Sequence, residues 1–155
     1  EKRASDASVR IEMKDGRDIT LEKVLDVDKL NDLALLQTNS RGHKYLTVSR
    51  NRPNLGSKVY AIGFPLSGSV SDLTITGGDA NAYRNCPSPY IRGKFVERLQ
   101  IDASVFPGSS GGPVLGADGK VVGVVVSGRV DVKSGNMNYA VPVDKLLDLM
   151  QKVRK

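Results

Sequence analysis

A serine flanked by glycines is the feature of this sequence with the clearest chemical use. Ser110 stands in the run GSSGGP at 108–113, with apolar segments on both sides. Acyl transfer needs a hydroxyl on a tight turn, with small neighbours that let a substrate carbonyl approach and backbone N–H groups converge on the developing oxyanion. A Gly/Ser cluster is also typical of a flexible linker, but the flanking apolar segments and Pro113 favour a fixed turn. The sequence therefore predicts a nucleophilic role for Ser110.

Residues 99–125 resemble the active-serine signature of the HtrA/Deg peptidases, which are trypsin-like serine peptidases with the chymotrypsin fold. The resemblance rests on Asp102-Ala103 followed by the segment 107–113. Other segments resemble, in the family's order, its catalytic-aspartate strand, the first strand of its second barrel, the hairpin after the serine and the strand before the closing helix: 28–36, 58–65, 118–123 and 139–142. The resemblance implies a serine endopeptidase that hydrolyses polypeptides through an acyl-enzyme.

The same resemblance implies a role for each residue of the site. Ser110 corresponds to the nucleophile and Asp32 to the group that orients the base. The oxyanion hole corresponds to residues 108–110, with the amides of Gly108 and Ser110 as donors and Ser109 where many members have Asn or Asp. Ser104 corresponds to the floor of the pocket for the side chain before the scissile bond, and its small neutral side chain implies no preference for Lys or Arg. Backbone pairing with an extended substrate is implied for Val125, Val126 and Ser127.

The residues alone leave several readings of the aspartate open. Asp32 has the position of an ordinary aspartate at the start of a strand, and Asp26 and Asp28 are nearby alternatives. Neither alternative directly precedes the apolar run at 33–36. Together with the resemblance of the Ser110 segment, this position favours Asp32 as the orienting carboxylate.

The base that would activate Ser110 is not evident in this sequence. The chymotrypsin fold requires the chain order histidine, aspartate, serine, but the single histidine, His43, follows Asp32. We expect His43 to lie in a solvated turn. Either the segment with the catalytic histidine is missing from this sequence, or the chain is a pseudo-peptidase that binds polypeptides without cleaving them as a scaffold module. A barrel without two of its strands would expose unpaired edges, which favours the first explanation or strands supplied by another chain.

Short alternating segments broken by turn residues predict an all-β fold with one C-terminal helix. Segment 8–14 alternates apolar and polar residues, and the Asp15-Gly16 turn predicts a hairpin with the strand that follows. Residues 45–48 are predicted to form another short strand. The longest segment without a strand pattern is 78–94. Residues 143–153 have apolar side chains at helical spacing: Val143, Leu146, Leu147, Met150 and Val153.

About ten strands favour closed antiparallel barrels. We expect two antiparallel six-stranded-type barrels, the first incomplete, within one peptidase domain. The segment 51–56 is the predicted boundary between them, which gives residues 1–52 as the remainder of the N-terminal barrel and 53–155 as the C-terminal barrel with its helix.

Composition excludes several other classes of protein. The net charge of +6 is spread along the chain and interleaved with acidic residues, and aromatic residues are 5%, which disfavours a nucleic-acid-binding barrel. No apolar run is long enough to span a membrane, and no signal peptide is recognisable. The single cysteine, Cys86, precludes an internal disulfide and has no partner for a metal. We expect no cofactor and no metal, a polypeptide substrate and, by resemblance, a bacterial, extracytoplasmic protein that forms homotrimers.

Overall fold

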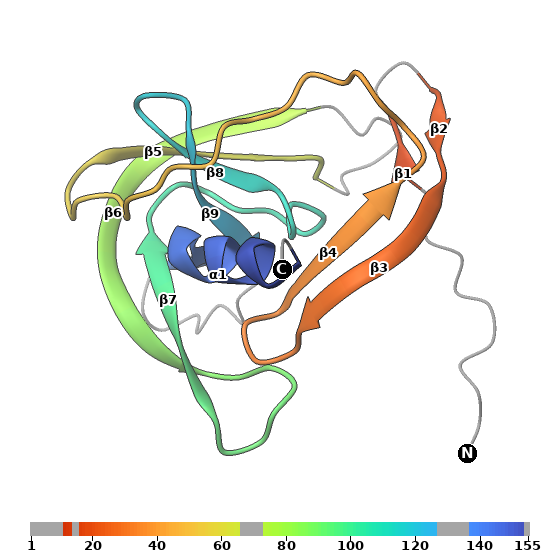
Figure 1. Cartoon of the computed structure of the whole chain (residues 1–155). Coiled ribbons are helices and arrows are strands. Elements are labelled where there is room, and N and C mark those ends of the chain that lie inside the picture. The colour runs from red at the N-terminus through yellow and green to blue at the C-terminus, as the bar shows by residue number, and fades with distance from the viewer. Residues whose placement is uncertain (1–10, 14–15, 66–72, 127–136, 154–155) are drawn as a thin grey trace.

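The computed structural model describes residues 11–13, 16–65, 73–126 and 137–153 (Figure 1). These residues form ten β-strands, one helix and the segments that connect them. The first four strands are β1 (Ile11–Glu12), β2 (Asp18–Ile19), β3 (Leu21–Asp28) and β4 (Leu33–Thr38). The remaining elements are β5 (Lys58–Gly63), β6 (Thr74–Pro87), β7 (Phe95–Ile101), β8 (Pro113–Gly116), β9 (Val121–Val126), β10 (Asn138–Pro142) and α1 (Val143–Val153). The fold is therefore mostly β, as the sequence predicts.

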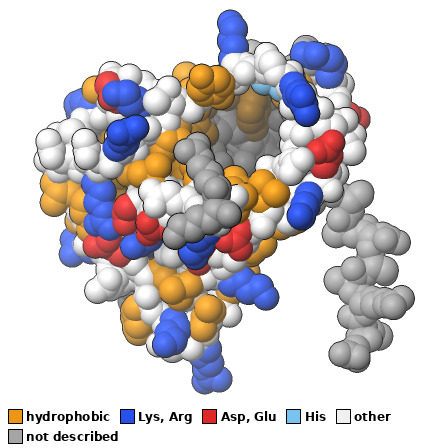
Figure 2. Space-filling view, in the orientation of Figure 1, with side chains coloured by type: hydrophobic (Ala, Val, Ile, Leu, Met, Phe, Trp, Pro, Cys, Tyr) orange, Lys and Arg blue, Asp and Glu red, His pale blue; other side chains and the backbone are white. Residues whose placement is uncertain are grey.

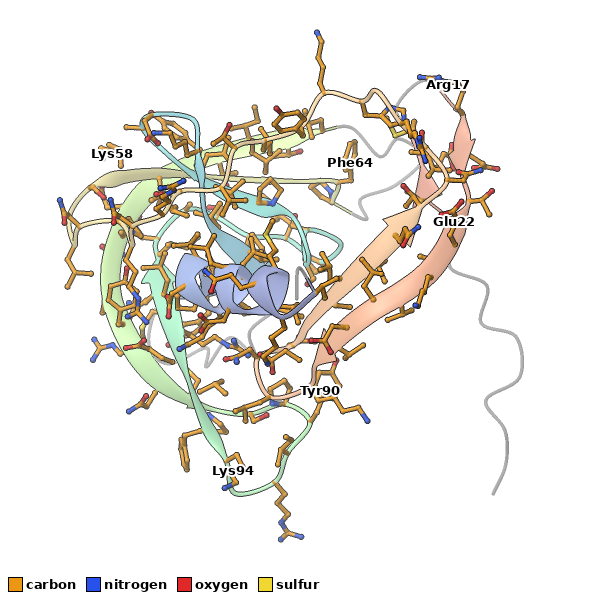
Figure 3. The ribbon with its side chains drawn as sticks, in the orientation of Figure 1. Arg17, Glu22, Lys58, Phe64, Tyr90 and Lys94 are labelled. Atoms are coloured by element: carbon orange, nitrogen blue, oxygen red, sulfur yellow. The ribbon has the colours of Figure 1, made fainter. Side chains whose placement is uncertain are left out.

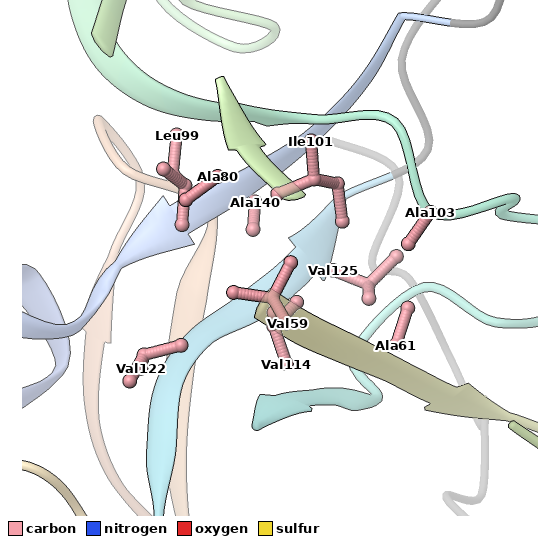
Figure 4. Packing of buried hydrophobic residues seen from close by; sticks show 10 residues of the cluster. All are labelled: Val59, Ala61, Ala80, Leu99, Ile101, Ala103, Val114, Val122, Val125 and Ala140. Atoms are coloured by element: carbon pink, nitrogen blue, oxygen red, sulfur yellow. The ribbon is translucent and has the colours of Figure 1, made fainter. Parts of the chain in front are cut away.

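The last six strands close into one antiparallel barrel. Their order around the barrel is β10-β7-β6-β5-β8-β9, so every strand has two neighbours and no edge is left unpaired. Apolar side chains from all six strands fill its interior together with Ala103 of the loop after β7, as Figure 4 shows. Val59, Leu99 and Val114 are completely buried there. This barrel is the rigid body that carries the serine turn.

The first half of the chain forms two small sheets. β1 pairs with β2, and β3 pairs with β4. On β3 and β4 the apolar side chains of Val24, Val27 and Leu36 are exposed. The β3–β4 sheet nevertheless packs against the barrel and the helix, because Leu33 is buried in one cluster with Val141 of β10 and Leu149 of α1. An incomplete first barrel and the division at residue 52 stay predictions.

The expected irregular segment at 78–94 is largely a strand, and this prediction was wrong. β6 continues to Pro87 and pairs with β7 from Ala80↔Ile101 to Pro87↔Phe95, so that Cys86 lies on a strand. Backbone pairing to β5 on one side and β7 on the other supports β6 where its polar and glycine-rich sequence gives no signal. Tyr90 and Lys94 mark the hairpin that projects beyond it in Figure 3.

Two other predicted elements also differ in the structure. The predicted strand at 45–48 contributes only an isolated parallel bridge between Val48 and Val121. In the predicted strand at 8–14, only Ile11–Glu12 is a described strand, and residues 8–10 and 14 lie outside the described part of the chain.

The helix α1 packs against β9 and β10 of the barrel and against the β3–β4 sheet (Figure 1). Val143 and Leu149 are its buried residues, and Leu146 packs against the cluster that Leu149 forms with Leu33 and Val141. The predicted apolar face was therefore partly wrong: Leu149 was missed, whereas Val153 is exposed. Of the helices that the structure describes, none has the length and apolar character to cross a membrane.

Candidate active site

The serine turn lies between β7 and β8 and is tied to β9 by main-chain hydrogen bonds. The amide of Gly111 donates to the carbonyl of Val125 (2.9 Å), and the amide of Val125 donates to the carbonyl of Gly112 (2.8 Å). Within the turn, the amide of Gly112 donates to the carbonyl of Ser109 (3.0 Å). The turn is therefore a fixed part of the barrel, as the flanking apolar segments predict, and it leaves the residue Ser110 exposed.

The backbone of this turn requires glycine at positions 111 and 112 for different reasons, and Gly108 also has a left-handed φ of 96°. Gly111 has φ of 84°, in the region that side chains other than glycine rarely adopt. Gly112 lies so close to β5 that a Cβ atom there would be 2.1 Å from the carbonyl oxygen of Ile62. The two glycines let the chain turn sharply against β5 and present Ser110 at its outer side.

Two amides of the turn remain available for a ligand. Across the described ranges, neither the Gly108 nor the Ser110 amide donates to a backbone carbonyl, whereas the amide of Ser109 donates to the carbonyl of Phe106 (3.0 Å). Ser110 likewise makes no side-chain hydrogen bond within those ranges. The amides of Gly108 and Ser110 thus have no carbonyl partner there, and they lie beside the free hydroxyl of Ser110. Such a pair of amides could donate hydrogen bonds to a developing oxyanion.

Behind the turn, Ser109 points away from the exposed side. Ser109 is 7% exposed. With Ser104 and Phe106 it lines a pocket of about 10 Å³, whose wall also includes Gly63 of β5 and Thr76 of β6. A space of this size can hold about one water molecule. Ser104 therefore lies in the loop before the serine, beside a small pocket with hydroxyl groups in its wall.

One residue of the strand that is predicted to pair with substrate is already bonded to the serine turn. Both main-chain groups of Val125 are bonded to the turn, and its side chain is 1% exposed in the core. Val126 follows at the end of β9, opposite Tyr139 of β10. Ser127 lies outside the described residues.

Asp32 lies at the end of the turn between β3 and β4, in an exposed position. Its φ of 65° is left-handed, a conformation that Asp and Asn tolerate better than most residues. Asp28 closes the turn by accepting from the backbone amide (3.0 Å) and side-chain amide (2.7 Å) of Asn31. Asp26 accepts from the amide of Val27 (2.8 Å). The two alternative aspartates thus have local structural partners, while Asp32 makes no hydrogen bond through its side chain within the described part of the chain.

Arg98 supports this turn from the barrel, and the sequence analysis missed it. Its guanidinium is almost completely buried, at 4% residue exposure, and donates to the carbonyl of Asn31 (3.0 Å). Burial lowers the pKa of Arg98, and the nearby Asp32 carboxylate opposes that shift. The available signal was a cation between the apolar residues Val96 and Leu99 of a predicted strand, but its partner is distant in sequence.

The serine turn is bonded to β9, and the aspartate turn is linked to β9 through a shared apolar cluster. Val125 bonds the serine turn, while its neighbours Val124 and Val126 pack in the cluster that contains Leu33, the residue after Asp32. Within the described chain no hydrogen bond joins Asp32 to Ser110 directly. β9 is therefore the common support for both turns.

His43 is engaged elsewhere. Its Nε2 forms a short hydrogen bond with the hydroxyl of Ser40, three residues earlier in the loop after β4. This local contact agrees with the expected loop position. Among the described residues, no group of three His, Cys, Asp or Glu side chains could hold a metal ion.

Arg52 fixes the segment between the two halves of the chain. It makes a bidentate contact with Asp144 of α1 (2.8 Å for each bond) and an ion pair with Glu97 of β7 (2.5 Å). The guanidinium carbon also lies 4.7 Å from the centroid of the Tyr83 ring. These contacts hold residue 52 against both the barrel and the helix.

Comparison with known proteins agrees with this geometry. Residues 2–124 match the family model of the trypsin-like peptidase domain. The "Serine protease HtrA-like" proteins of Staphylococcus aureus strains RF122 / ET3-1 and MRSA252 are 31% and 30% identical over 136 and 138 residues, or 83% and 84% of this chain. The chain spans only 18% of the length of either relative.

Solved structures show the same fold. The HtrA-type protease AlgW, solved with a decapeptide, has a TM-score of 0.78 and 25% identity, and covers 97% of this chain and 45% of its own. The active form of the Rv3671c protease from M. tuberculosis has a TM-score of 0.75 and 22% identity, with 89% of this chain and 60% of its own covered. The chain therefore belongs to the trypsin-like peptidase domain family and is of the HtrA type.

Proposed function

We propose that this chain carries the nucleophile, the oxyanion hole and the orienting carboxylate of a serine endopeptidase that hydrolyses polypeptides through an acyl-enzyme. The observation that carries the proposal is the serine turn: an exposed Ser110 on a fixed bend, beside the free amides of Gly108 and Ser110. In the reaction, the Ser110 oxygen attacks the scissile carbonyl, and the two amides stabilise the negative charge that develops on the carbonyl oxygen. The Ser109 amide, which is bonded to Phe106, acts by shaping the turn.

The proposed reaction needs a base that takes the Ser110 proton and is oriented by Asp32. His43 does not serve, because it hydrogen-bonds Ser40 in the loop after β4 and follows Asp32 in the chain. The free side chain of Asp32, set beside the buried Arg98, supports its orienting role. We propose that the base comes from outside residues 1–155 and belongs to a first barrel to which β3 and β4 contribute.

The substrate in this proposal is an extended segment of polypeptide. It pairs with Val126 at the end of β9, while Val125 supports the serine turn; pairing at Ser127 stays a prediction. Ser104 forms the floor of the pocket for the side chain before the scissile bond, with no charge to select Lys or Arg. On the face shown in Figure 2 the cations are interspersed with acidic side chains, which supports a peptide partner over nucleic acid. Extracytoplasmic location and a homotrimer are part of the same proposal, by analogy with the family.

The engagement of His43 favours one alternative, a pseudo-peptidase that binds peptides without cleaving them. Cleavage of an unfolded protein by the complete gene product separates the two functions. The proposal predicts hydrolysis that is abolished in Ser110→Ala and retained in Ser40→Ala. Saturable peptide binding without hydrolysis, unchanged by Ser110→Ala, would instead establish the alternative.

A further inference from the structure

Two side chains on different strands hold the loop that leads into the serine turn. Thr76 Oγ1 of β6 donates to the carbonyl of Ser104 (2.6 Å), and Asn138 Nδ2 of β10 donates to the carbonyl of Ala103 (2.8 Å). We propose that Thr76 and Asn138 are positioning residues that set the shape of the pocket for the substrate side chain before the scissile bond. The inference rests on the proposed peptidase function and names the residues that determine its selectivity.

The loop depends on these bonds because it leaves the sheet just before them. The ladder of β7 ends at Ile101, which pairs with Ala80 of β6 and Asn138 of β10. Among the described residues, the only backbone hydrogen bond to the loop 103–107 is the one that Phe106 accepts from Ser109. Each of two successive carbonyls is instead bonded by a side chain from one neighbouring strand. Through the side chains of Thr76 and Asn138, β6 and β10 thus bind the loop beyond the point where their backbone pairing with β7 ends.

The loop is also packed closely enough for a lost bond to matter. Ala103 is completely buried, and a Cβ atom at Gly78 would lie 2.2 Å from its amide nitrogen. Gly78 of β6 therefore lies directly against Ala103, and the two hydrogen bonds to the loop are partly buried. A partly buried acceptor that loses its donor carries part of the desolvation penalty, so the loop would move to find a new partner.

The bonds connect directly to the site. Thr76, Ser104, Phe106 and Ser109 line the same small pocket, and Phe106 accepts the amide hydrogen bond of Ser109. A displacement of Ser104 therefore changes the floor expected to contact the substrate and shifts the residue next to Ser110. A misplacement of about 1 Å at such a site can cost about 100-fold in rate.

The experiment uses the complete gene product with Thr76→Val and Asn138→Leu, which remove the donors while approximately keeping side-chain size. Thr76→Ser restores a hydroxyl, and Thr38→Val on β4 is the matched control. Initial rates are measured on peptides that differ only in the residue before the scissile bond. We expect kcat/KM to fall by about tenfold or more in the two donor-free variants, with a changed order of preference, and to recover in Thr76→Ser. An unchanged order, with all peptides slowed equally or not at all, would overturn the inference.

Hydrogen–deuterium exchange of residues 103–109 provides a readout that does not need activity. We expect faster exchange in Thr76→Val and Asn138→Leu but not in Thr38→Val. If the unmodified protein cleaves no peptide, the proposed function fails, while the exchange still tests the two bonds. If it cleaves and both donor-free variants keep its exchange rates and preferences, only the positioning inference fails.

Discussion

The carbonyl of Val125 accepts a 2.9 Å hydrogen bond from the amide of Gly111, the residue immediately after the proposed nucleophile. Together with the hydrogen bond from the Val125 amide to the Gly112 carbonyl, this bond attaches the backbone of the serine turn to β9. The side chains of Val124 and Val126 pack in the same cluster as Leu33, next to Asp32. The strand β9, together with the cluster of Leu33, Val141 and Leu149, therefore links the two parts of the proposed site.

Ser110→Ala should remove reactivity without unfolding the protein. Ser110 is exposed and makes no side-chain hydrogen bond among the described residues, so its truncation should change the free energy of unfolding by less than about 0.5 kcal/mol. Ser109→Ala is the matched comparison, because that side chain is buried against β5. Urea unfolding and peptide hydrolysis of both variants measure the two effects separately. A large loss of stability in Ser110→Ala would contradict the exposed position.

Gly112→Ala should be strongly destabilising. The added Cβ would lie 2.1 Å from the carbonyl oxygen of Ile62, so the turn or β5 must shift, at a cost of about 2 kcal/mol or more. Gly77→Ala is the control, because its Cβ would meet only Tyr60, at an ordinary 3.5 Å. Thermal unfolding followed by circular dichroism compares the two variants. Equal melting temperatures would argue against the close contact between the serine turn and β5.

How much of this fold can be predicted depends on where the determining contacts lie in the sequence. The serine turn is predictable because its glycines and its flanking strands are neighbours in the chain. The strand β6 is not, since its polar stretch around Gly78 is supported by main-chain bonds to strands far away in sequence. Local apolar spacing indicates helix α1, but it misses Leu149, whose burial depends on the position of Leu33.

The site is predictable to the same extent. The motif predicts Ser110 as the nucleophile, and the apolar run after Asp32 favours Asp32 over the neighbouring aspartates; both roles stay predictions. The residues that support them, Arg98 for the aspartate turn and Thr76 for the serine loop, are bonded to carbonyls 67 and 28 positions away. No local pattern identifies such partners, and the structure is needed to find them.

Arg98→Leu should destabilise the protein more than the same change at its cross-strand neighbour. Arg98 is buried and bonded to the carbonyl of Asn31, and its loss leaves that acceptor without its donor, at a cost of about 1–3 kcal/mol. Arg84 is opposite Arg98 in the β6–β7 ladder but is exposed, so Arg84→Leu should change stability by less than about 0.5 kcal/mol. Denaturant midpoints of the two variants provide the test. Similar midpoints would contradict the supporting role of Arg98.

The Arg52–Asp144 contact should stabilise the fold only above about pH 4. Burial alone would raise the pKa of Asp144, but hydrogen bonds from Arg52 and Lys145 outweigh it and lower the pKa below its ordinary value. A carboxyl group with a lowered pKa in the folded state contributes stability above its unfolded pKa, and that contribution disappears as the pH falls through the folded pKa. Because both side chains are about a third exposed, Asp144→Asn should cost only about 1 kcal/mol at pH 7.

Urea unfolding of the unmodified protein and Asp144→Asn between pH 2.5 and 7 measures this difference in stability. The gap between the two proteins should close as the pH falls below about 4. Asp118→Asn is the control, because its partner Lys120 is only two residues away and both side chains are about half exposed. A gap that stayed constant over the whole pH range would show that charge at Asp144 is not the cause.

Labelling by a fluorophosphonate, with the modified residue located by mass spectrometry, is the most direct test of the central claim. The complete gene product, in its folded state, should be labelled at Ser110 and not at Ser104 or Ser109, and labelling should stop when the protein is unfolded. Folded protein that leaves Ser110 unmodified while a peptidase of the same fold reacts in parallel would contradict the account.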